Sequence, residues 1–170
     1  MKQVEPVAAI TRYYPLPTSL VTTVDPAGRD NLLTVGWFMR ASIDPVMVVI
    51  SLGHERYSYH GLLACREFAL CLPAQNLAEA VWYCGTHSGR HADKFAASGL
   101  KKLPAKVIRP VLVAGAAVAM ECRVNRVVET GDHTLFVADV VAAHMDESCP
   151  PLLFDFGSSK AQLKPILLHT

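Results

Sequence analysis

The sequence carries little charge and has no extended basic segment. Only 18% of its 170 residues are charged, the formal net charge is +1, and no basic run exceeds the pair Lys101-Lys102. Proteins that bind nucleic acid or acidic membrane surfaces generally present a strong positive field. The composition therefore predicts neither a nucleic-acid partner nor a membrane partner.

Long apolar runs are also missing. The longest, Pro110 to Met120, is about half of the roughly 20 residues that a membrane-spanning helix needs. The first residues include the charged Lys2 and Glu5 and an early Pro6, and they contain no continuous apolar core of a signal peptide. We expect neither a membrane span nor a secretory signal.

One common cysteine motif and one common glycine motif are absent from the sequence. No Cys-x-x-Cys pair occurs among the five cysteines, and no Gly-x-Gly-x-x-Gly follows a predicted strand, which argues against a Rossmann dinucleotide site. Cys65, Cys71 and Cys122 lie in apolar sequence, where reduced core cysteines are usual. This usage is typical of a reducing cytoplasm.

What the chain has in abundance is apolar sequence. Hydrophobic residues make up 51% of it, and the mean hydropathy is positive. A length of 170 residues predicts a single domain, residues 1–170, with a substantial core. With so few charged residues to cover it, some apolar surface is expected to lie against a partner, and we predict a homo-oligomer.

The apolar and β-branched segments predict about six strands, mostly paired as antiparallel hairpins, with helices inserted between them. Residues 1–17 read as an extended lead-in, residues 57–66 as a short helix, and residues 76–100 as a helical section. The fold class predicted is mainly β with inserted helices (α+β), a barrel rather than a βαβ fold. The predicted strands are residues 18–24, 31–42, 45–52, 67–72, 114–128 and 133–144, with residues 106–113 as a further extended segment.

The segment from Cys84 to Phe95 concentrates the residues that carry chemistry. Gly85 is placed to end the preceding helix in a left-handed turn. Ser88 and Gly89 continue a loop that enters a second helix, and Arg90 and Lys94 add positive charge. Such a loop suits an anion, which backbone N–H groups, a hydroxyl and two cations can bind. An ordinary solvated loop is the alternative.

Two other interpretations of the segment remain open at this stage. Cys84 and Arg90 have the Cys-x5-Arg spacing of cysteine-dependent phosphatases, although Tyr83 stands where those enzymes have a histidine and the preceding segment looks helical. Cys84, His87 and His91 have a spacing that suits zinc on one helix face, although no fourth ligand is evident.

The same segment, with its pattern Cys-Gly-x-x-Ser-Gly-Arg-x-x-Asp-Lys-Phe, resembles the flavin reductase-like, FMN-binding split-barrel family, which includes the flavoredoxins. Shorter motifs match that family in the same order along nearly the whole chain. They are Tyr14-Pro15-Leu16-Pro17, Asn31-x-x-Thr34-x-x-Trp37, Pro45 with its strand, Glu121-Cys122 and Gly131-Asp132-His133-x-x-Phe136.

The resemblance implies a Greek-key-like antiparallel split β-barrel that binds FMN and pairs as a homodimer with the flavin site near the interface. It places one set of residues beside the isoalloxazine ring: Asn31, Leu32, Leu33 and Thr34. It places a second set at the ribityl phosphate: Ser51, Arg56, Ser58, Ser88, Gly89, Arg90 and Lys94.

Two further residues concern the redox partner. In related reductases a histidine at the position of His133 lies near the nicotinamide or the flavin, so His133 is the candidate catalytic residue. Trp37 could stack near a flavin, but a strand tryptophan more often lies in the core. Residues 157–160 offer no aromatic residue where the family often brings one near the flavin.

The resemblance therefore implies an FMN-dependent oxidoreductase that passes electrons from NADH or NADPH through bound FMN to a small-molecule redox substrate or a redox partner protein. The flavin carries the redox chemistry, so no catalytic triad is required. Two alternatives stand beside this one. They are a flavoredoxin-type electron carrier and a non-enzymatic flavin-binding protein without NAD(P)H activity of its own.

Overall fold

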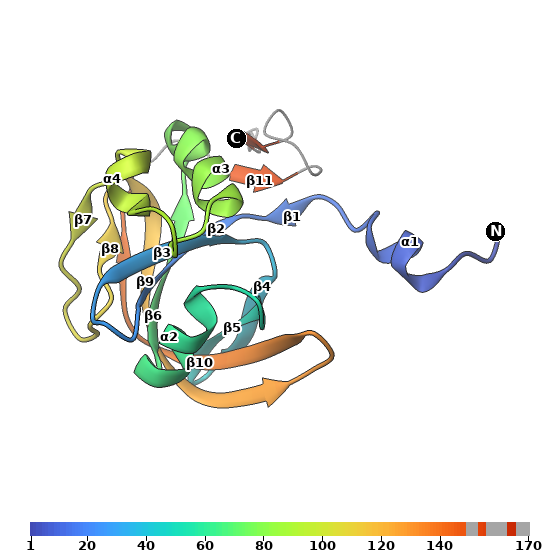
Figure 1. Cartoon of the computed structure of the whole chain (residues 1–170), viewed down its shortest axis with the longest axis horizontal. Coiled ribbons are helices and arrows are strands. Elements are labelled where there is room, and N and C mark those ends of the chain that lie inside the picture. Colours follow the sequence, from blue (N-terminus) through green and yellow to red (C-terminus); the bar gives the residue numbers. More distant parts are fainter. Residues whose placement is uncertain (149–152, 156–162, 166–170) are drawn as a thin grey trace.

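The computed structural model describes residues 1–148, 153–155 and 163–165 (Figure 1). Its main feature is a seven-stranded antiparallel sheet, whose strands in spatial order are β3 (Asp30–Val35), β2 (Ser19–Val24), β6 (Glu67–Pro73), β9 (Ala116–Glu129), β10 (His133–Met145), β5 (Val46–Gly53) and β4 (Phe38–Ile43). Two smaller sheets are formed by β1 (Leu16–Pro17), β11 (Leu153–Asp155) and β12 (Leu163–Pro165), and by β7 (Lys102–Leu103) and β8 (Leu112–Val113). The helices are α1 (Pro6–Ile10), α2 (Ser58–Cys65), the 3-10 helix η1 (Gln75–Leu77), α3 (Ala78–Thr86) and α4 (Lys94–Ser98). The predicted class, mainly antiparallel β with inserted helices, is confirmed.

Local turn chemistry explains the hairpin of β2 and β3. The Asp25 carboxylate accepts hydrogen bonds from the backbone N–H groups of Ala27 and Arg29, both at 2.9 Å. Gly28 has a φ of +82°, a conformation that favours glycine. The turn therefore fixes the register that pairs Val24 with Asp30. The hairpin of β9 and β10 also forms as predicted.

The chain crosses from one edge of the main sheet to the other between β3 and β4. Only Gly36 and Trp37 separate these two strands, yet β3 pairs with β2 and β4 pairs with β5. The predicted single strand over residues 31–42 is therefore wrong, because its two halves have different partners. Strand β3 also contacts β5 across the sheet, which means that the sheet curls until its two edges approach each other.

The core lies on both sides of β2 and β3. Leu20 and Leu32 pack in a cluster under α3 and α4, together with Val81 and Phe95. Their neighbours along the strands point the other way, into a second cluster around Phe68 and Phe136 inside the curled sheet. Because successive strand residues face opposite sides, and helices cover the outer side, every residue of β2 is buried.

Several predicted boundaries are wrong. Gly85 lies inside the last turn of α3 rather than beyond it, and the helix ends at Thr86. A Cβ on Gly85 would lie 3.3 Å from Thr34, which means that Gly85 packs closely against β3. The lead-in contains the short helix α1, and of residues 106–113 only Leu112–Val113 form a strand. Residues 157–160 lie outside the described residues.

No described helix is long and apolar enough to cross a membrane.

Glu121 joins the barrel to the loop between β7 and β8. This carboxylate is fully buried. It accepts hydrogen bonds from the backbone N–H groups of Lys106 and Val107 at 2.8 Å and of Ile108 at 3.2 Å. His144 Nε2 lies 2.8 Å from the same carboxylate. Burial raises the pKa of Glu121, but these contacts outweigh burial and the net pKa is lowered.

We predict that Glu121→Gln lowers the free energy of unfolding by about 2–4 kcal/mol, because buried donors lose a charged acceptor. Since the folded-state pKa of Glu121 is lowered from 4.5, its contribution is present above that pH and is lost as the pH falls through the folded-state pKa. Urea unfolding between pH 7 and pH 3 measures both effects. The exposed Glu129→Gln is the control, and equal stabilities of the two variants would contradict the prediction.

Candidate functional site

A cavity of about 530 Å³ opens where the two edges of the main sheet approach each other. Its volume lies within the range of pockets that bind cofactors and small ligands. One wall comes from β3 and the crossing to β4, another from the end of β5 and the loop that follows, and a third from the end of α3 and its loop. The lining residues are Leu33–Trp37, Ser51–Gly53, Glu55–Ser58, Cys84–Gly89, Lys94 and His133.

Strand β3 presents an open edge to this cavity. In the main sheet its only hydrogen-bonded neighbour is β2, among the residues that the structure describes. In an antiparallel strand the backbone groups that do not face the partner strand point outward. The outward backbone groups next to Leu33 and Thr34 are therefore available to a planar ligand with a polar edge. The side chain of Thr34 is engaged elsewhere, since its hydroxyl donates to the Val81 carbonyl of α3.

Lys94 brings a buried positive charge to the cavity wall. The residue is 5% exposed, and its Nζ donates a hydrogen bond to the Cys84 carbonyl at 2.9 Å. Among the described residues no carboxylate lies within ion-pair distance of it. Burial lowers the pKa of Lys94 to about 8, and the positive charge of Arg56 acts in the same direction. A buried ammonium without a counter-ion is costly, and an anion in the cavity would offset that cost.

The thiol of Cys84 is packed rather than reactive. The residue is 1% exposed within α3. Burial raises the pKa of its thiol, and the nearby Lys94 only partly opposes this. A phosphatase nucleophile needs the opposite, an accessible thiol with a lowered pKa, so the structure overturns the phosphatase interpretation. The zinc interpretation fails as well, because the described part of the chain contains no group of three histidine, cysteine or acidic side chains placed to hold a metal.

The loop after α3 packs tightly against β3. A Cβ on Gly89 would clash with Asn31 Oδ1 and lie 3.1 Å from the Tyr57 ring, so only glycine fits there without displacement. The Asn31 amide in turn donates to Ser58 Oγ at 2.7 Å. The start of α4 is not free for an anion, because Asp93 accepts from the N–H groups of Phe95 and Ala96. Side chains and loop groups must therefore hold any anion.

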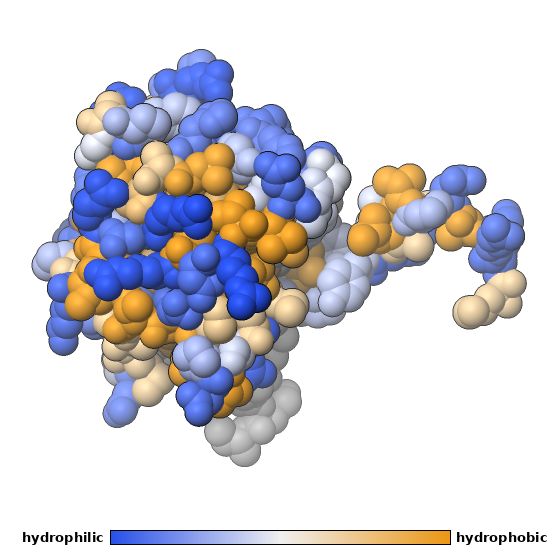
Figure 2. Space-filling view, turned by 90° about the horizontal axis from the view of Figure 1, so that it is seen from below, coloured by the Kyte–Doolittle hydropathy of each residue, from blue (hydrophilic) through white to orange (hydrophobic). Residues whose placement is uncertain are grey.

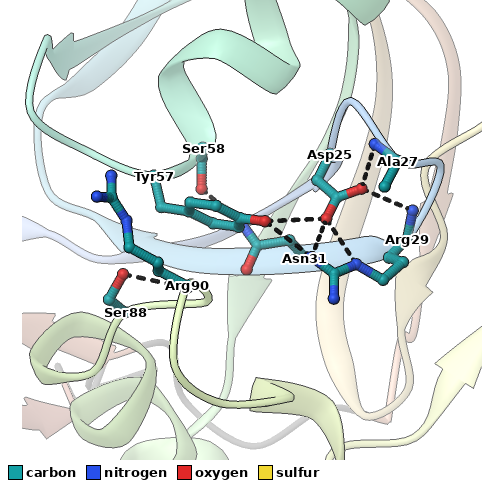
Figure 3. Close-up of polar contacts among 8 residues, drawn as sticks. All are labelled: Asp25, Ala27, Arg29, Asn31, Tyr57, Ser58, Ser88 and Arg90. Atoms are coloured by element: carbon teal, nitrogen blue, oxygen red, sulfur yellow. Dashed lines mark hydrogen bonds and ion pairs between the residues drawn. The ribbon is translucent and has the colours of Figure 1, made fainter.

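Tyr57 is held beside this loop through its hydroxyl (Figure 3). Its hydroxyl donates to Asp25 Oδ2 and accepts from Arg29 Nη2, both at 3.0 Å. The Arg90 guanidinium lies over the ring, 5.8 Å from its centroid. Asp25 also forms an ion pair with Arg29 at 2.8 Å. Its pKa is lowered chiefly by the backbone hydrogen bond from Arg29, so the carboxylate stays charged at neutral pH.

Trp37 and His133 form an aromatic part of the cavity lining. Their rings stack with centroids 4.7 Å apart. His133 Nδ1 lies 2.6 Å from Asp132 Oδ1, which leaves Nε2 as the ring nitrogen free for a ligand. Trp37 is 51% exposed. The expectation that it lies in the core is therefore wrong, because the crossing between the sheet edges carries it to the rim.

Most of the residues predicted for the site share this cavity. Those that line it are Leu33, Thr34, Ser51, Arg56, Ser58, Ser88, Gly89, Lys94 and His133. Three lie outside the lining: Leu32 is in the core, Asn31 supports Ser58, and Arg90 covers Tyr57.

Sequence reasoning missed several lining residues, among them Glu55, Tyr57, Thr86 and His87. The first two flank predicted residues of the loop after β5, and the other two lie within the motif after α3. Their positions in the sequence, next to predicted site residues, could have indicated that they line the cavity. The assembled site combines a buried cation and hydroxyl groups with a stacked aromatic pair. This suits a ligand with a phosphate at one end and a flat ring system.

The model of the flavin reductase like domain matches residues 11–162 of this chain. A relative from Streptomyces pristinaespiralis, named NADH:riboflavin 5'-phosphate oxidoreductase, is 30% identical over 147 residues, which are 81% of this chain and 76% of the relative.

Solved structures agree with this match. The FMN-binding protein from Thermus thermophilus superposes with a TM-score of 0.83 at 27% identity, over 93% of this chain and 91% of that one. Flavoredoxin from Methanosarcina acetivorans superposes with a TM-score of 0.85 at 19% identity, over 100% of this chain and 93% of that one. The fold is therefore the split barrel expected from the sequence.

Proposed function

The chain belongs to the flavin reductase-like domain family, and we propose that it is an FMN-dependent oxidoreductase that takes electrons from NADH or NADPH. The observation that carries the proposal is the buried, uncompensated ammonium of Lys94 at the wall of a cavity with one open strand edge. A flavin with a terminal phosphate matches both features, whereas riboflavin matches only the second.

The residues present fit FMN. Lys94, Ser58 and Ser88 would hold the phosphate, with Arg56 at the rim, where its 3.0 Å ion pair with Glu55 is largely exposed. The outward backbone groups of β3 near Leu33 and Thr34 would bond the polar edge of the ring system. Bound FMN would supply the redox chemistry, accepting a hydride from the nicotinamide and passing electrons to an acceptor.

His133 and Trp37 would receive the nicotinamide or the acceptor. Asp132 holds the His133 imidazole through Nδ1, and the stacked Trp37 fixes its plane. An imidazole fixed in this way can donate or accept a hydrogen bond at Nε2. The flavoredoxin-type carrier remains the second candidate, favoured by the likeness of fold to flavoredoxin. In that case the acceptor or donor would be a redox protein.

We propose a reducing cytoplasm as the compartment. Four cysteines of the described residues are free thiols: Cys65, Cys71, Cys84 and Cys122. Cys71 and Cys122 are fully buried, which raises their pKa values to about 11 and about 12. Such thiols persist where disulfides do not form.

We also propose a homodimer. Helix α1 stands away from the body (Figure 1), and Figure 2 shows apolar side chains exposed along this arm. None of its residues is buried, and a helix of five residues is unstable alone in water. The edge strand β4 exposes Met39 and Ile43, which are 63% and 74% exposed. A second copy would cover both surfaces.

The proposed function predicts a yellow complex with FMN that NADH or NADPH reduces. The protein is mixed with FMN, freed of excess, and titrated anaerobically with each nucleotide while the visible spectrum is recorded. Loss of the flavin absorbance with either nucleotide supports the oxidoreductase. Binding of FMN without reduction by NADH or NADPH would favour the carrier, and no FMN binding in calorimetry would contradict both.

Lys94→Ala should weaken FMN binding by roughly ten- to a hundredfold, because one charge-assisted contact contributes about 1.5–3 kcal/mol. Riboflavin, which lacks the phosphate, should bind with nearly unchanged affinity. Cys84→Ser is the matched control from the same motif and should leave both affinities largely intact. Equal losses for FMN and riboflavin would place Lys94 away from the phosphate.

The pKa of Lys94 adds a pH dependence to the same measurement. With a pKa of about 8 in the unliganded protein, Lys94 loses its proton as the pH rises from 7 to 9.5, and a neutral amine binds the phosphate less well. FMN affinity should therefore fall over this range in the unaltered protein. In Lys94→Ala, and with riboflavin, this component of the pH dependence should be absent.

The homodimer predicts twice the mass of an 18.5 kDa chain in light scattering at micromolar concentration. Removal of residues 1–12 together with Ile43→Lys should weaken the association, because apolar contact area is lost at both surfaces. Val128→Lys, which changes another exposed apolar residue on β9, is the control. A monomeric unaltered protein would refute the proposal.

A further inference from the structure

A second, smaller cavity adjoins the site, and we call it the side cavity. Its volume is about 230 Å³. Four of its lining residues also line the first cavity: Thr34, Gly36, Gly85 and Thr86. Because β3 and the end of α3 contribute to both cavities, a ligand in the side cavity would lie next to the ring system that the proposed function places along β3.

The side cavity has an uncharged lining. Its other residues are Thr18, which precedes β2, Val81 and Trp82 of α3, and Leu163 of β12. None of the described residues that line it has a charged or titratable side chain. The first cavity, by contrast, is lined by the ammonium of Lys94. Since burying an unpaired charge is costly, the side cavity favours a neutral ligand.

One hydroxyl group of the lining lacks a hydrogen-bond partner. The Thr34 hydroxyl donates to the Val81 carbonyl. The Thr86 hydroxyl donates to the Trp82 carbonyl at 2.9 Å. Thr18 is 4% exposed, and its Oγ1 has no partner among the residues that the structure describes. A buried hydroxyl without a partner carries a desolvation cost, which a carbonyl oxygen of a ligand would offset.

The volume of the side cavity limits its ligand to about one ring. A cavity of about 150 Å³ can hold benzene, whereas pockets for drug-sized ligands begin at about 300 Å³. Val81, Trp82 and Leu163 make much of the lining apolar. These features together match a neutral, single-ring compound with a carbonyl oxygen.

We propose that the side cavity binds a single-ring quinone and that this quinone is the electron acceptor of the protein. The inference rests on the proposed function, because the electrons reach the quinone from the reduced flavin in the first cavity. The quinone takes up two electrons and two protons and becomes a hydroquinone. NADH or NADPH supplies a hydride, and the second proton comes from solvent, so that the nucleotide leaves oxidised.

The uncharged lining favours a quinone over an acceptor that is reduced at carbon. In a quinone both protons end on oxygen, where they exchange rapidly with water. An acceptor reduced at a carbon–carbon double bond needs a positioned acid to protonate carbon, and no titratable side chain lines the side cavity in the described part of the chain. The Thr18 hydroxyl suffices to orient a quinone oxygen.

The experiment follows reoxidation of the FMN-loaded protein, reduced with dithionite and mixed without oxygen with duroquinone, a fully methylated benzoquinone that does not add to thiols. The rate should saturate with duroquinone concentration. Thr18→Val, which keeps the side-chain shape, should raise the half-saturating concentration by about three- to tenfold, because one hydrogen bond is lost. Leu163→Trp, which fills the side cavity, should remove saturation. Reoxidation by ferricyanide, a charged acceptor, should stay unchanged in both variants.

Thr23→Val is the matched control. Thr23 is 1% exposed, its hydroxyl also lacks a partner among the described residues, and it does not line either cavity. This variant should leave the duroquinone dependence unaltered.

Binding is measured separately without FMN. The chain has two tryptophans, Trp37 in the first cavity and Trp82 in the side cavity. In Trp37→Phe, saturable quenching of the remaining Trp82 fluorescence by duroquinone should weaken when Thr18→Val is added.

Three results would overturn the inference. One is an equal effect of Thr18→Val and Thr23→Val on the duroquinone dependence. Another is an equal loss of duroquinone and ferricyanide reoxidation in Leu163→Trp, which would place the effect at the flavin. The third is reoxidation that never saturates, together with no quenching of Trp82. Failure of the unaltered protein to bind FMN would instead overturn the proposed function, and it is detected before any quinone is added.

Discussion

The buried ammonium of Lys94 is the constraint on which the site depends. Moving a charged group out of water is unfavourable unless a counter-charge or hydrogen bonds replace the solvent. In this protein the Cys84 carbonyl replaces one water partner of the ammonium. The cost of burial that remains lowers the pKa of Lys94 to about 8. The position of Lys94 follows from the Asp93 cap at the start of α4 and from the end of α3. The fold thus carries a local cost that an anionic ligand would relieve.

The curled sheet supplies the rest of the site. Strands β3 and β4 lie at opposite edges of the sheet and do not pair with each other, so the outward side of β3 is left without a strand partner in the described residues. An exposed strand edge invites unwanted pairing. In this fold α3 and its loop cover β3, with Gly85 and Gly89 allowing close approach. The result is a slot with backbone donors and acceptors along one side.

The hairpins and the helix over residues 57–66 could be predicted because their signals are local: turn residues, β-branched runs and apolar patterns. The break at Gly36 and Trp37 could not, since it depends on which distant strands β3 and β4 pair with. The exposed position of Trp37 follows from that break. Within Asn31–Thr34, strand alternation sends Leu32 into one core cluster and Leu33 into the other, where it also borders the cavity. The motif therefore located the strand but not the direction of each side chain.

The motif from Cys84 to Phe95 contributes mainly backbone groups and close packing to the site. Ligand binding and ligand specificity therefore depend on different residues. Cys84 provides a carbonyl, Gly85 and Gly89 allow close packing, and Asp93 caps a helix. None of these roles depends on the redox partner. Residues that can distinguish one nucleotide or acceptor from another therefore lie outside the packed core of the motif. They are the stacked pair Trp37 and His133, and Tyr57 with Arg90 over its ring. A shared motif can accordingly preserve the proposed phosphate site while the residues around it vary.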